Sequence, residues 1–236
     1  KGTDNENRIG PKRALQSGII SPKQMRNAIF INVIICLFLV LTLIYQAFGA
    51  DKFLTSFIFI GLGVLAIIAA IKYTVGRSAY GYKALGDLMV FLFFGWLSVL
   101  GTYFLYSNQI DYLILLPASS IGLLSAGVLN LNNMRDFESD KLSNKHTLAG
   151  YLGLENARKY HLTLIILAIF LMLLYFCLLS DQLSISLIMI GFIPLFIHLN
   201  SCNKVQNPKD YDPQLKVLAL STFLLALIFG ASHILI

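Results

Sequence analysis

Residues 112–140 read YLILLPASSIGLLSAGVLNLNNMRDFESD, an uncharged stretch that ends in a cluster of charge. The twenty residues 112–131 carry no charge, and about 20 mostly apolar residues are enough for a helix to cross a bilayer. Asp136 and Asp140 then follow four residues apart, so a continuing helix places them on one face. The stretch therefore predicts a membrane helix with two carboxylates where it meets the water.

The rest of the chain has the composition of a polytopic membrane protein. Its 236 residues are 57% hydrophobic and 13% charged, whereas soluble domains carry roughly 25% charged residues. Seven stretches are long and apolar enough to span a bilayer as helices. These are residues 25–48, 53–74, 86–106, 112–132, 161–180, 183–202 and 216–236. We expect an all-α bundle of transmembrane helices that forms a single domain over residues 1–236.

Basic residues predict the orientation of these helices. Seventeen of the eighteen Lys and Arg residues fall in residues 1–27 or in alternate connections, and only Lys52 falls in the opposite set. Because cytoplasmic loops are enriched in Lys and Arg, we expect Lys1 in the cytoplasm and Ile236 on the far side. The net charge of +6 then belongs to loops that face anionic membrane lipid, and it requires no nucleic-acid partner.

The spacing of cysteine and histidine predicts no site. Cys36 and Cys177 fall within predicted helices, Cys202 falls at a helix end, and no pair has the spacing of zinc ligands. We interpret the four scattered histidines as structural; they are His146, His161, His198 and His233. The sequence therefore predicts neither a disulfide nor a metal site from these residues.

The charge cluster after the quoted helix is the strongest candidate site. Asp136 and Asp140 offer hard oxygen ligands of the kind that Mg²⁺ prefers, and Asn132 and Asn133 add neutral ones. Two carboxylates with Mg²⁺ usually need a phosphate-bearing substrate to complete the coordination, and Lys145 follows closely enough to meet phosphate oxygens. The alternative is a solvated helix end.

Two further segments carry candidate residues. Residues 1–18 include three basic residues suited to hold an anion, or simply to orient the next helix: Arg8, Lys12 and Arg13. Residues 72–87 combine glycines and tyrosines with Asp87, which is either a helix-terminal charge or a polar contact in the site. The aromatic residues that follow either line a hydrophobic pocket or pack and face lipid; they are Phe91, Phe93, Phe94, Trp96 and Tyr103.

These motifs resemble those of the UbiA superfamily of intramembrane prenyltransferases. NNMRDFESD at 132–140, followed by KHTLA at 145–149, is similar to the second aspartate-rich motif of that superfamily. Six further motifs resemble those of one branch of the superfamily, which prenylates 1,4-dihydroxy-2-naphthoate in menaquinone synthesis. They are RIGP at 8–11, QSG at 16–18, YGY at 80–82, LGD at 85–87, FFG at 93–95 and GTY at 101–103. The chain departs from the branch at Ala79, where proline is usual, and at Asn144, where glycine is usual.

The resemblance implies a bundle of nine helices around a cavity that faces the cytoplasm, and seven of the nine are expected here. It also implies that the family's first aspartate-rich motif precedes this chain, with Gly2 and Asp4 as its remnant. The single prenyltransferase domain is on this basis expected to be incomplete at its N-terminus. The expected location is the inner membrane of a bacterium, with the active site facing the cytoplasm.

The activity implied by the resemblance is Mg²⁺-dependent transfer of a polyprenyl group from polyprenyl diphosphate to 1,4-dihydroxy-2-naphthoate, with loss of the carboxylate, giving demethylmenaquinol. The expected metal ligands are Asp136, Asp140 and Asp4, and Lys145 is expected to act with them in catalysis. The expected substrate-binding residues are Arg8, Lys12, Arg13, Lys72, Tyr73, Tyr82, Asp87, Asn132 and Asn133. The alternatives are a related enzyme that prenylates 4-hydroxybenzoate or a tocopherol or phylloquinone precursor and, more remotely, a cation-coupled transporter that uses the same acids.

Overall fold

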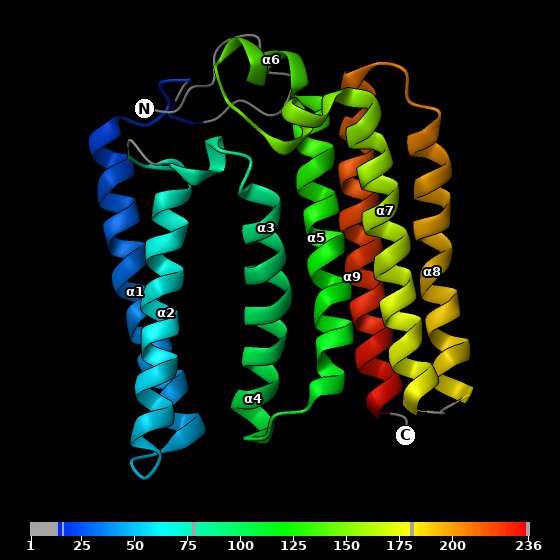
Figure 1. Cartoon of the computed structure of the whole chain (residues 1–236). Helices are drawn as coiled ribbons and strands as arrows, with labels where there is room; N and C mark the ends of the chain where they lie inside the picture. The colour runs from blue at the N-terminus through cyan, green and yellow to red at the C-terminus, as the bar shows by residue number, and fades with distance from the viewer. Residues whose placement is uncertain (1–13, 16, 77–78, 180–181, 235–236) are drawn as a thin grey trace.

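The computed structural model describes residues 14–15, 17–76, 79–179 and 182–234, and it contains seven helices that are long and apolar enough to cross a membrane (Figure 1). The first half comprises α1 (Pro22–Phe48), α2 (Phe53–Thr74), η1 (Tyr80–Tyr82), α3 (Gly86–Val90), η2 (Phe91–Leu100) and α4 (Gly101–Ser107). The second half comprises η3 (Tyr112–Ile114), α5 (Leu115–Arg135), α6 (Phe137–Leu142), α7 (Leu148–Leu179), α8 (Gln182–Asn203), η4 (Pro208–Tyr211) and α9 (Asp212–Ile234). The predicted all-α bundle is confirmed.

The first helix begins where its sequence provides a cap. The Ser21 hydroxyl accepts a hydrogen bond from the backbone N–H of Gln24, and the Gln24 side chain accepts one from the backbone N–H of Ser21. Pro22 occupies the first helical position, where a missing N–H costs nothing. This reciprocal capping box fixes the start of α1 at Pro22.

In two of the predicted spans, the structure differs from what the sequence predicts. The third is a composite, because α3 passes into the π-helical η2 before α4 completes it. The fifth begins at Leu148 rather than at residue 161, with a kink at Gly153, whose φ is +74°. Its first turns are polar, so hydropathy alone assigned them to a loop over residues 133–160, where the structure instead has α6 and the start of α7.

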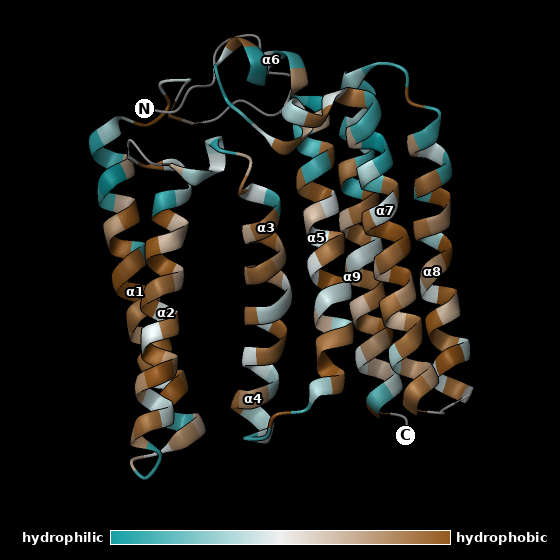
Figure 2. Ribbon diagram, in the orientation of Figure 1, coloured by the Kyte–Doolittle hydropathy of each residue, from teal (hydrophilic) through white to brown (hydrophobic). Residues whose placement is uncertain are grey.

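The helix α5 lies at the centre of the bundle and contacts α3, η2, α7 and α9. Its Ser120 hydroxyl donates to the carbonyl of Ala168, and its Asn130 amide donates to the carbonyl of Ala157, so both polar groups are paired with α7. By contrast, α1 and α2 pair with each other and expose apolar side chains along most of their length. Figure 2 shows that the ribbons of both helices are coloured hydrophobic over most of their length. Such surfaces suit contact with lipid tails.

The connections divide between the two ends of the bundle as the sequence predicts. One end carries α6, η1 and the segment before α9, and the opposite end carries the short turns after α1 and α4 and the last turn of α7 (Figure 1). At that opposite end the Lys52 ammonium donates to the side-chain oxygen of Asn108 at 2.8 Å.

Candidate active site

Asn132, Asp136 and Asp140 follow one another at the junction of α5 and α6. The backbone N–H of Asp136 donates to the carbonyl of Asn132 at 3.0 Å, and that of Asp140 donates to the carbonyl of Asp136 at 2.8 Å. The helix bends at Asp136, whose φ and ψ are −89° and 9°, but the four-residue hydrogen-bond pattern continues through the bend. Both carboxylates are buried. Asp136 and Asp140 therefore keep the predicted four-residue relation, although the bend divides them between two helices.

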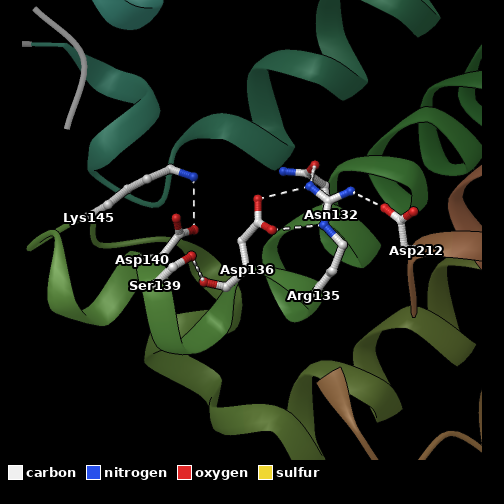
Figure 3. Close-up of polar contacts among 7 residues, drawn as sticks. All are labelled: Asn132, Arg135, Asp136, Ser139, Asp140, Lys145 and Asp212. Carbon is white, nitrogen blue, oxygen red and sulfur yellow. Dashed lines mark hydrogen bonds and ion pairs between the residues drawn. The ribbon is translucent and has the colours of Figure 1, made fainter. Parts of the chain in front are cut away.

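Arg135 holds the Asp136 carboxylate through a two-pronged ion pair (Figure 3). Its Nε and Nη2 donate to the two carboxylate oxygens at 2.8 and 2.9 Å, its Nη1 donates to Asp212 at 2.6 Å, and its Nη2 also donates to Asn132 at 2.7 Å. Arg135 is itself buried and joins the end of α5 to the start of α9. The sequence interpretation assigned no role to Arg135 or Asp212; the one signal was an arginine within an acidic cluster.

Lys145 pairs with the second aspartate. Its ammonium lies 2.8 Å from a carboxylate oxygen of Asp140, and its backbone N–H donates to the carbonyl of Asp140 at 2.9 Å. The preceding Asn144 has a φ of +51°, a left-handed conformation that Asn adopts more readily than most residues, so glycine is not required there. The backbone N–H of Ala84 donates to the carbonyl of His146 at 2.7 Å, which holds the segment after η1 against this loop.

Two cavities open beside these charges. One of about 380 Å³ is lined by Asp140, Lys145, His146 and Tyr151 among others. A smaller one of about 70 Å³ is lined by residues that the sequence assigned to the site, namely Tyr73, Tyr82, Asn132, Asn133 and Lys145. The structure thus brings residues from the end of α2, η1 and α5 to one place.

Some predicted site residues are not placed there. Lys72 is exposed near the end of α2 and is absent from the described linings of these two cavities. Asp4, Arg8, Lys12 and Arg13 lie outside the residues that the structure describes. Their expected roles stay predictions.

Asp87 is a buried carboxylate at the start of α3, with 3% of its surface exposed. Among the described residues, neither of its oxygens meets hydrogen-bond geometry, although the Tyr160 hydroxyl of α7 lies beside it. A buried carboxylate without a partner is costly, typically by several kcal/mol, unless a proton, a cation or a donor group is supplied. The burial of Asp87 distinguishes it from a solvated helix-terminal charge and brings Tyr160, which the sequence did not indicate, next to it. Its expected role as a polar contact in the site stays a prediction.

The charges of the cluster suit a divalent cation with an anionic partner. Three carboxylates, from Asp136, Asp140 and Asp212, are paired with two cations, Arg135 and Lys145. The oxygen donors are the hard ligands that Mg²⁺ prefers, and the two cations suit phosphate oxygens. The donor set present in the described residues thus fits Mg²⁺, with Asn132 and Asn133 close by.

A long apolar groove leads away from this cluster. One cavity of about 440 Å³ lies between α2, η1 and α3, beginning at Tyr73 and Tyr80, and a second of about 840 Å³ continues to Tyr112 at the opposite end of the bundle. The two cavities share Met89 and Phe93 in their linings. Of the predicted aromatic residues, Phe93, Phe94, Trp96 and Tyr103 line the groove, whereas Phe91 packs edge-on against Trp96.

Comparison with known proteins gives consistent matches. The UbiA prenyltransferase family matches residues 1–227. The chain is 45% identical over 166 residues to a 1,4-dihydroxy-2-naphthoate octaprenyltransferase from Escherichia coli, a match that covers 70% of this chain and 53% of that protein. It is 38% identical over 230 residues to the protein of the same description from Haemophilus influenzae, covering 98% of this chain and 74% of that protein.

More distant matches extend to eukaryotes. A UbiA prenyltransferase domain-containing protein 1 from Dictyostelium discoideum is 32% identical over 162 residues, covering 69% of this chain and 48% of that protein. The aligned regions thus span about half of two of these relatives and about three quarters of the third. No solved structure matches.

Proposed function

The chain belongs to the UbiA prenyltransferase family, and we propose from this premise that it transfers a polyprenyl group from polyprenyl diphosphate to 1,4-dihydroxy-2-naphthoate. One observation carries the proposal: the cluster of carboxylates and cations borders a small polar cavity, and Tyr73 lines both that cavity and the apolar groove that runs along the bundle. A polyprenyl diphosphate has the same division into a charged head and a long apolar tail. The descriptions of the bacterial relatives supply the acceptor.

The charged cluster is suited to the head of the donor. Asp136 and Asp140, assisted by Asn132 and Asn133, are the residues that would hold Mg²⁺, which when bound neutralises the diphosphate and makes it a better leaving group. Lys145 now pairs with Asp140 and is close enough to exchange that partner for a phosphate oxygen. Arg135 keeps Asp136 in place from the opposite side, so the carboxylate does not need to reorient when the donor arrives.

The proposed reaction balances without a redox partner. The allylic C–O bond of the donor breaks, and its electron pair leaves with the diphosphate. The electron-rich naphthoate ring then forms a C–C bond to the allylic carbon at the position that bears the carboxylate. The carboxylate leaves as CO₂, and its bonding electrons restore the aromatic ring, giving demethylmenaquinol.

Asp87 is our candidate for the acceptor. Tyr160 is the neighbouring donor on α7, although its contact with Asp87 does not meet strict hydrogen-bond geometry, and a ring hydroxyl of the naphthoate would supply a further donor. Tyr160 beside it would help to orient the same group. On this proposal the acceptor enters from the side of α3 and α7, while the donor occupies the groove between α2 and η2.

The test is product analysis by mass spectrometry with the full-length protein in lipid, Mg²⁺ and an octaprenyl donor. Separate reactions contain dihydroxynaphthoate, 4-hydroxybenzoate or a tocopherol precursor as acceptor. We expect one prenylated and decarboxylated product, from dihydroxynaphthoate. If only another acceptor gives product, the chain is a prenyltransferase of the same family that uses that acceptor instead of dihydroxynaphthoate. Cation transport without any prenylated product would contradict the proposal.

A further inference from the structure

A second cluster of polar side chains lies inside the bundle, on helices other than those that carry Asp136 and Asp140. His161 comes from α7, and His198 and Cys202 come from α8; all three are buried, with at most 2% of their surface exposed. One ligand atom from each lies within 4.8 Å of the others. His198 is near the last residue of α8, so the cluster sits toward the end of the bundle that carries α6.

The spacing within α8 suits shared binding of one ion. His198 and Cys202 are four residues apart and therefore lie on the same face of the helix. His161 is 37 residues earlier in the chain, and its Nε2 approaches the Nε2 of His198 to 2.9 Å. The Cys202 sulfur lies 3.5 Å from that same Nε2 of His198. All three ligand atoms thus converge on one point between α7 and α8.

The distances are close to those of a coordinated ion. Bonds of about 2.0–2.1 Å to nitrogen and about 2.3 Å to sulfur hold the ligand atoms of a tetrahedral site roughly 3.3–3.6 Å apart. The separation of the sulfur from His198 already matches, and the two nitrogens need to move apart by only about 0.4 Å to reach the same spacing. A hydrogen bond between the two histidines would use neither the sulfur nor Nδ1 of His161.

Gln214 of α9 supplies the supporting contact that a metal-binding histidine normally has. Its side-chain oxygen lies 3.2 Å from Nδ1 of His198 and accepts a hydrogen bond when that nitrogen carries the proton. This contact leaves Nε2 of His198 without the proton and 2.9 Å from Nε2 of His161, while the Cys202 sulfur lies 3.5 Å from Nε2 and 3.7 Å from Nδ1 of the His198 ring. Nδ1 of His161 has no partner among the described residues, so it is available to carry the proton of that ring.

We propose that His161, His198 and Cys202 bind one thiophilic cation, Cu⁺ or Zn²⁺, through two imidazole nitrogens and a thiolate. On binding, the thiol proton is released to water, and the proton between the two imidazoles moves to Nδ1 of His161. Soft sulfur and imidazole ligands select these ions over Mg²⁺. One thiolate makes the site neutral with Cu⁺ and leaves one net positive charge with Zn²⁺; because Arg158 acts electrostatically on Cys202, Cu⁺ suits the interior better.

The test measures metal bound by the full-length protein in lipid nanodiscs. The wild type, Cys202→Ser and the matched control Cys177→Ser, which changes an exposed cysteine, are each equilibrated with Cu⁺ under reducing conditions and, separately, with Zn²⁺ against a competing chelator. We expect about one ion per chain in the wild type and in Cys177→Ser, and at least about tenfold weaker binding in Cys202→Ser. Comparison of the Cu⁺ measurement with the Zn²⁺ measurement identifies which ion the site binds.

X-ray absorption at the edge of the bound metal gives a second reading that needs no variant. We expect one sulfur and two imidazoles around the ion in the wild type, so the proposal remains testable if Cys202→Ser does not fold. Equal binding by Cys202→Ser and Cys177→Ser, no uptake of either ion by the wild type, or a spectrum without sulfur would each overturn it. Prenyl transfer is not measured, so the outcome is independent of the proposed function.

Discussion

At the scale of single residues, the site depends on how buried charges are paired. Asp136 is fixed by both of its oxygens to Arg135, and Asp140 is fixed to Lys145 from the loop that follows α6. Removal of one partner from a buried ion pair strongly destabilises the protein, because it leaves an uncompensated charge away from water. The same pairs hold the two carboxylates in position for a cation.

We predict that Asp136→Asn and Asp140→Asn each lower turnover by at least about a hundredfold, because loss of one carboxylate weakens the binding of the Mg²⁺ that would neutralise the diphosphate, an electrostatic contribution of roughly 3 kcal/mol. The measurement is the initial rate of prenyl transfer at saturating Mg²⁺, with the thermal midpoint of unfolding recorded for each variant. Glu138→Gln is the matched control, because Glu138 is exposed on the same short helix. Near-normal, Mg²⁺-dependent rates in either aspartate variant would refute the metal assignment.

A second prediction concerns the role of Arg135 as a positioning residue. Arg135→Gln should lower the free energy of unfolding by about 3–5 kcal/mol, because Asp136 and Asp212 then lose their shared partner. The double variant with Asp136→Asn should recover part of that loss, since the buried charge is removed too. Lys141→Gln, at an exposed position of α6, serves as control. Denaturant titration in detergent measures all four, and strictly additive losses would argue against the pair.

At the scale of elements, the site depends on how closely η2 approaches α5. A Cβ on Gly95 would lie 2.7 Å from the carbonyl oxygen of Ala118, and a Cβ on Gly122 would lie 2.8 Å from that of Phe91. Small residues at helix contacts allow such approach in membranes, where no hydrophobic driving force acts between helices. This contact fixes the position of η2, whose Phe93 and Trp96 form part of the wall of the groove.

We therefore predict that Gly95→Ala and Gly122→Ala each destabilise the fold by about 1–3 kcal/mol, the usual range for overpacking a tight contact. Gly101→Ala is the control on the same span, because a Cβ there would meet no atom within 4 Å. Thermal unfolding in one detergent compares the three variants. An unchanged midpoint in both Gly95→Ala and Gly122→Ala would mean that η2 and α5 are further apart than described.

At the scale of the whole molecule, the two ends of the bundle differ in charge and in length of connection. The end with α6 carries the long basic segments and the candidate site, and the opposite end carries short turns with Lys52 as the single basic residue assigned to it by sequence (Figure 1). The positive-inside rule therefore predicts that the end with α6 faces the cytoplasm.

Labelling tests this orientation in a background without the exposed Cys36 and Cys177. Lys141→Cys marks the end with α6, and Asp51→Cys marks the opposite end; both positions are exposed. In intact cells, a membrane-impermeant maleimide should label only Asp51→Cys, and both should label once the membrane is broken. Labelling of Lys141→Cys in intact cells would reverse the topology.

The sequence by itself determined the helices and the candidate motif. Hydropathy is a local property, and each apolar segment satisfies its own backbone hydrogen bonds inside a bilayer, so the seven spans follow from composition alone. The capping box at Ser21 and the four-residue spacing of Asp136 and Asp140 are local in the same sense. These features therefore agree between sequence and structure, apart from the polar start of α7 and the π-helical part of the third span.

Only the tertiary structure decided which distant residues meet. Arg135 pairs with Asp212, 77 residues later, and His161 meets His198 across 37 residues, contacts that no local pattern encodes. Two of the four histidines interpreted as structural, His161 and His198, thus form with Cys202 the cluster proposed above as a metal site. The physical reason is that contacts between membrane helices depend on close fit and polar pairing rather than on hydropathy, and these appear only when the helices are packed together.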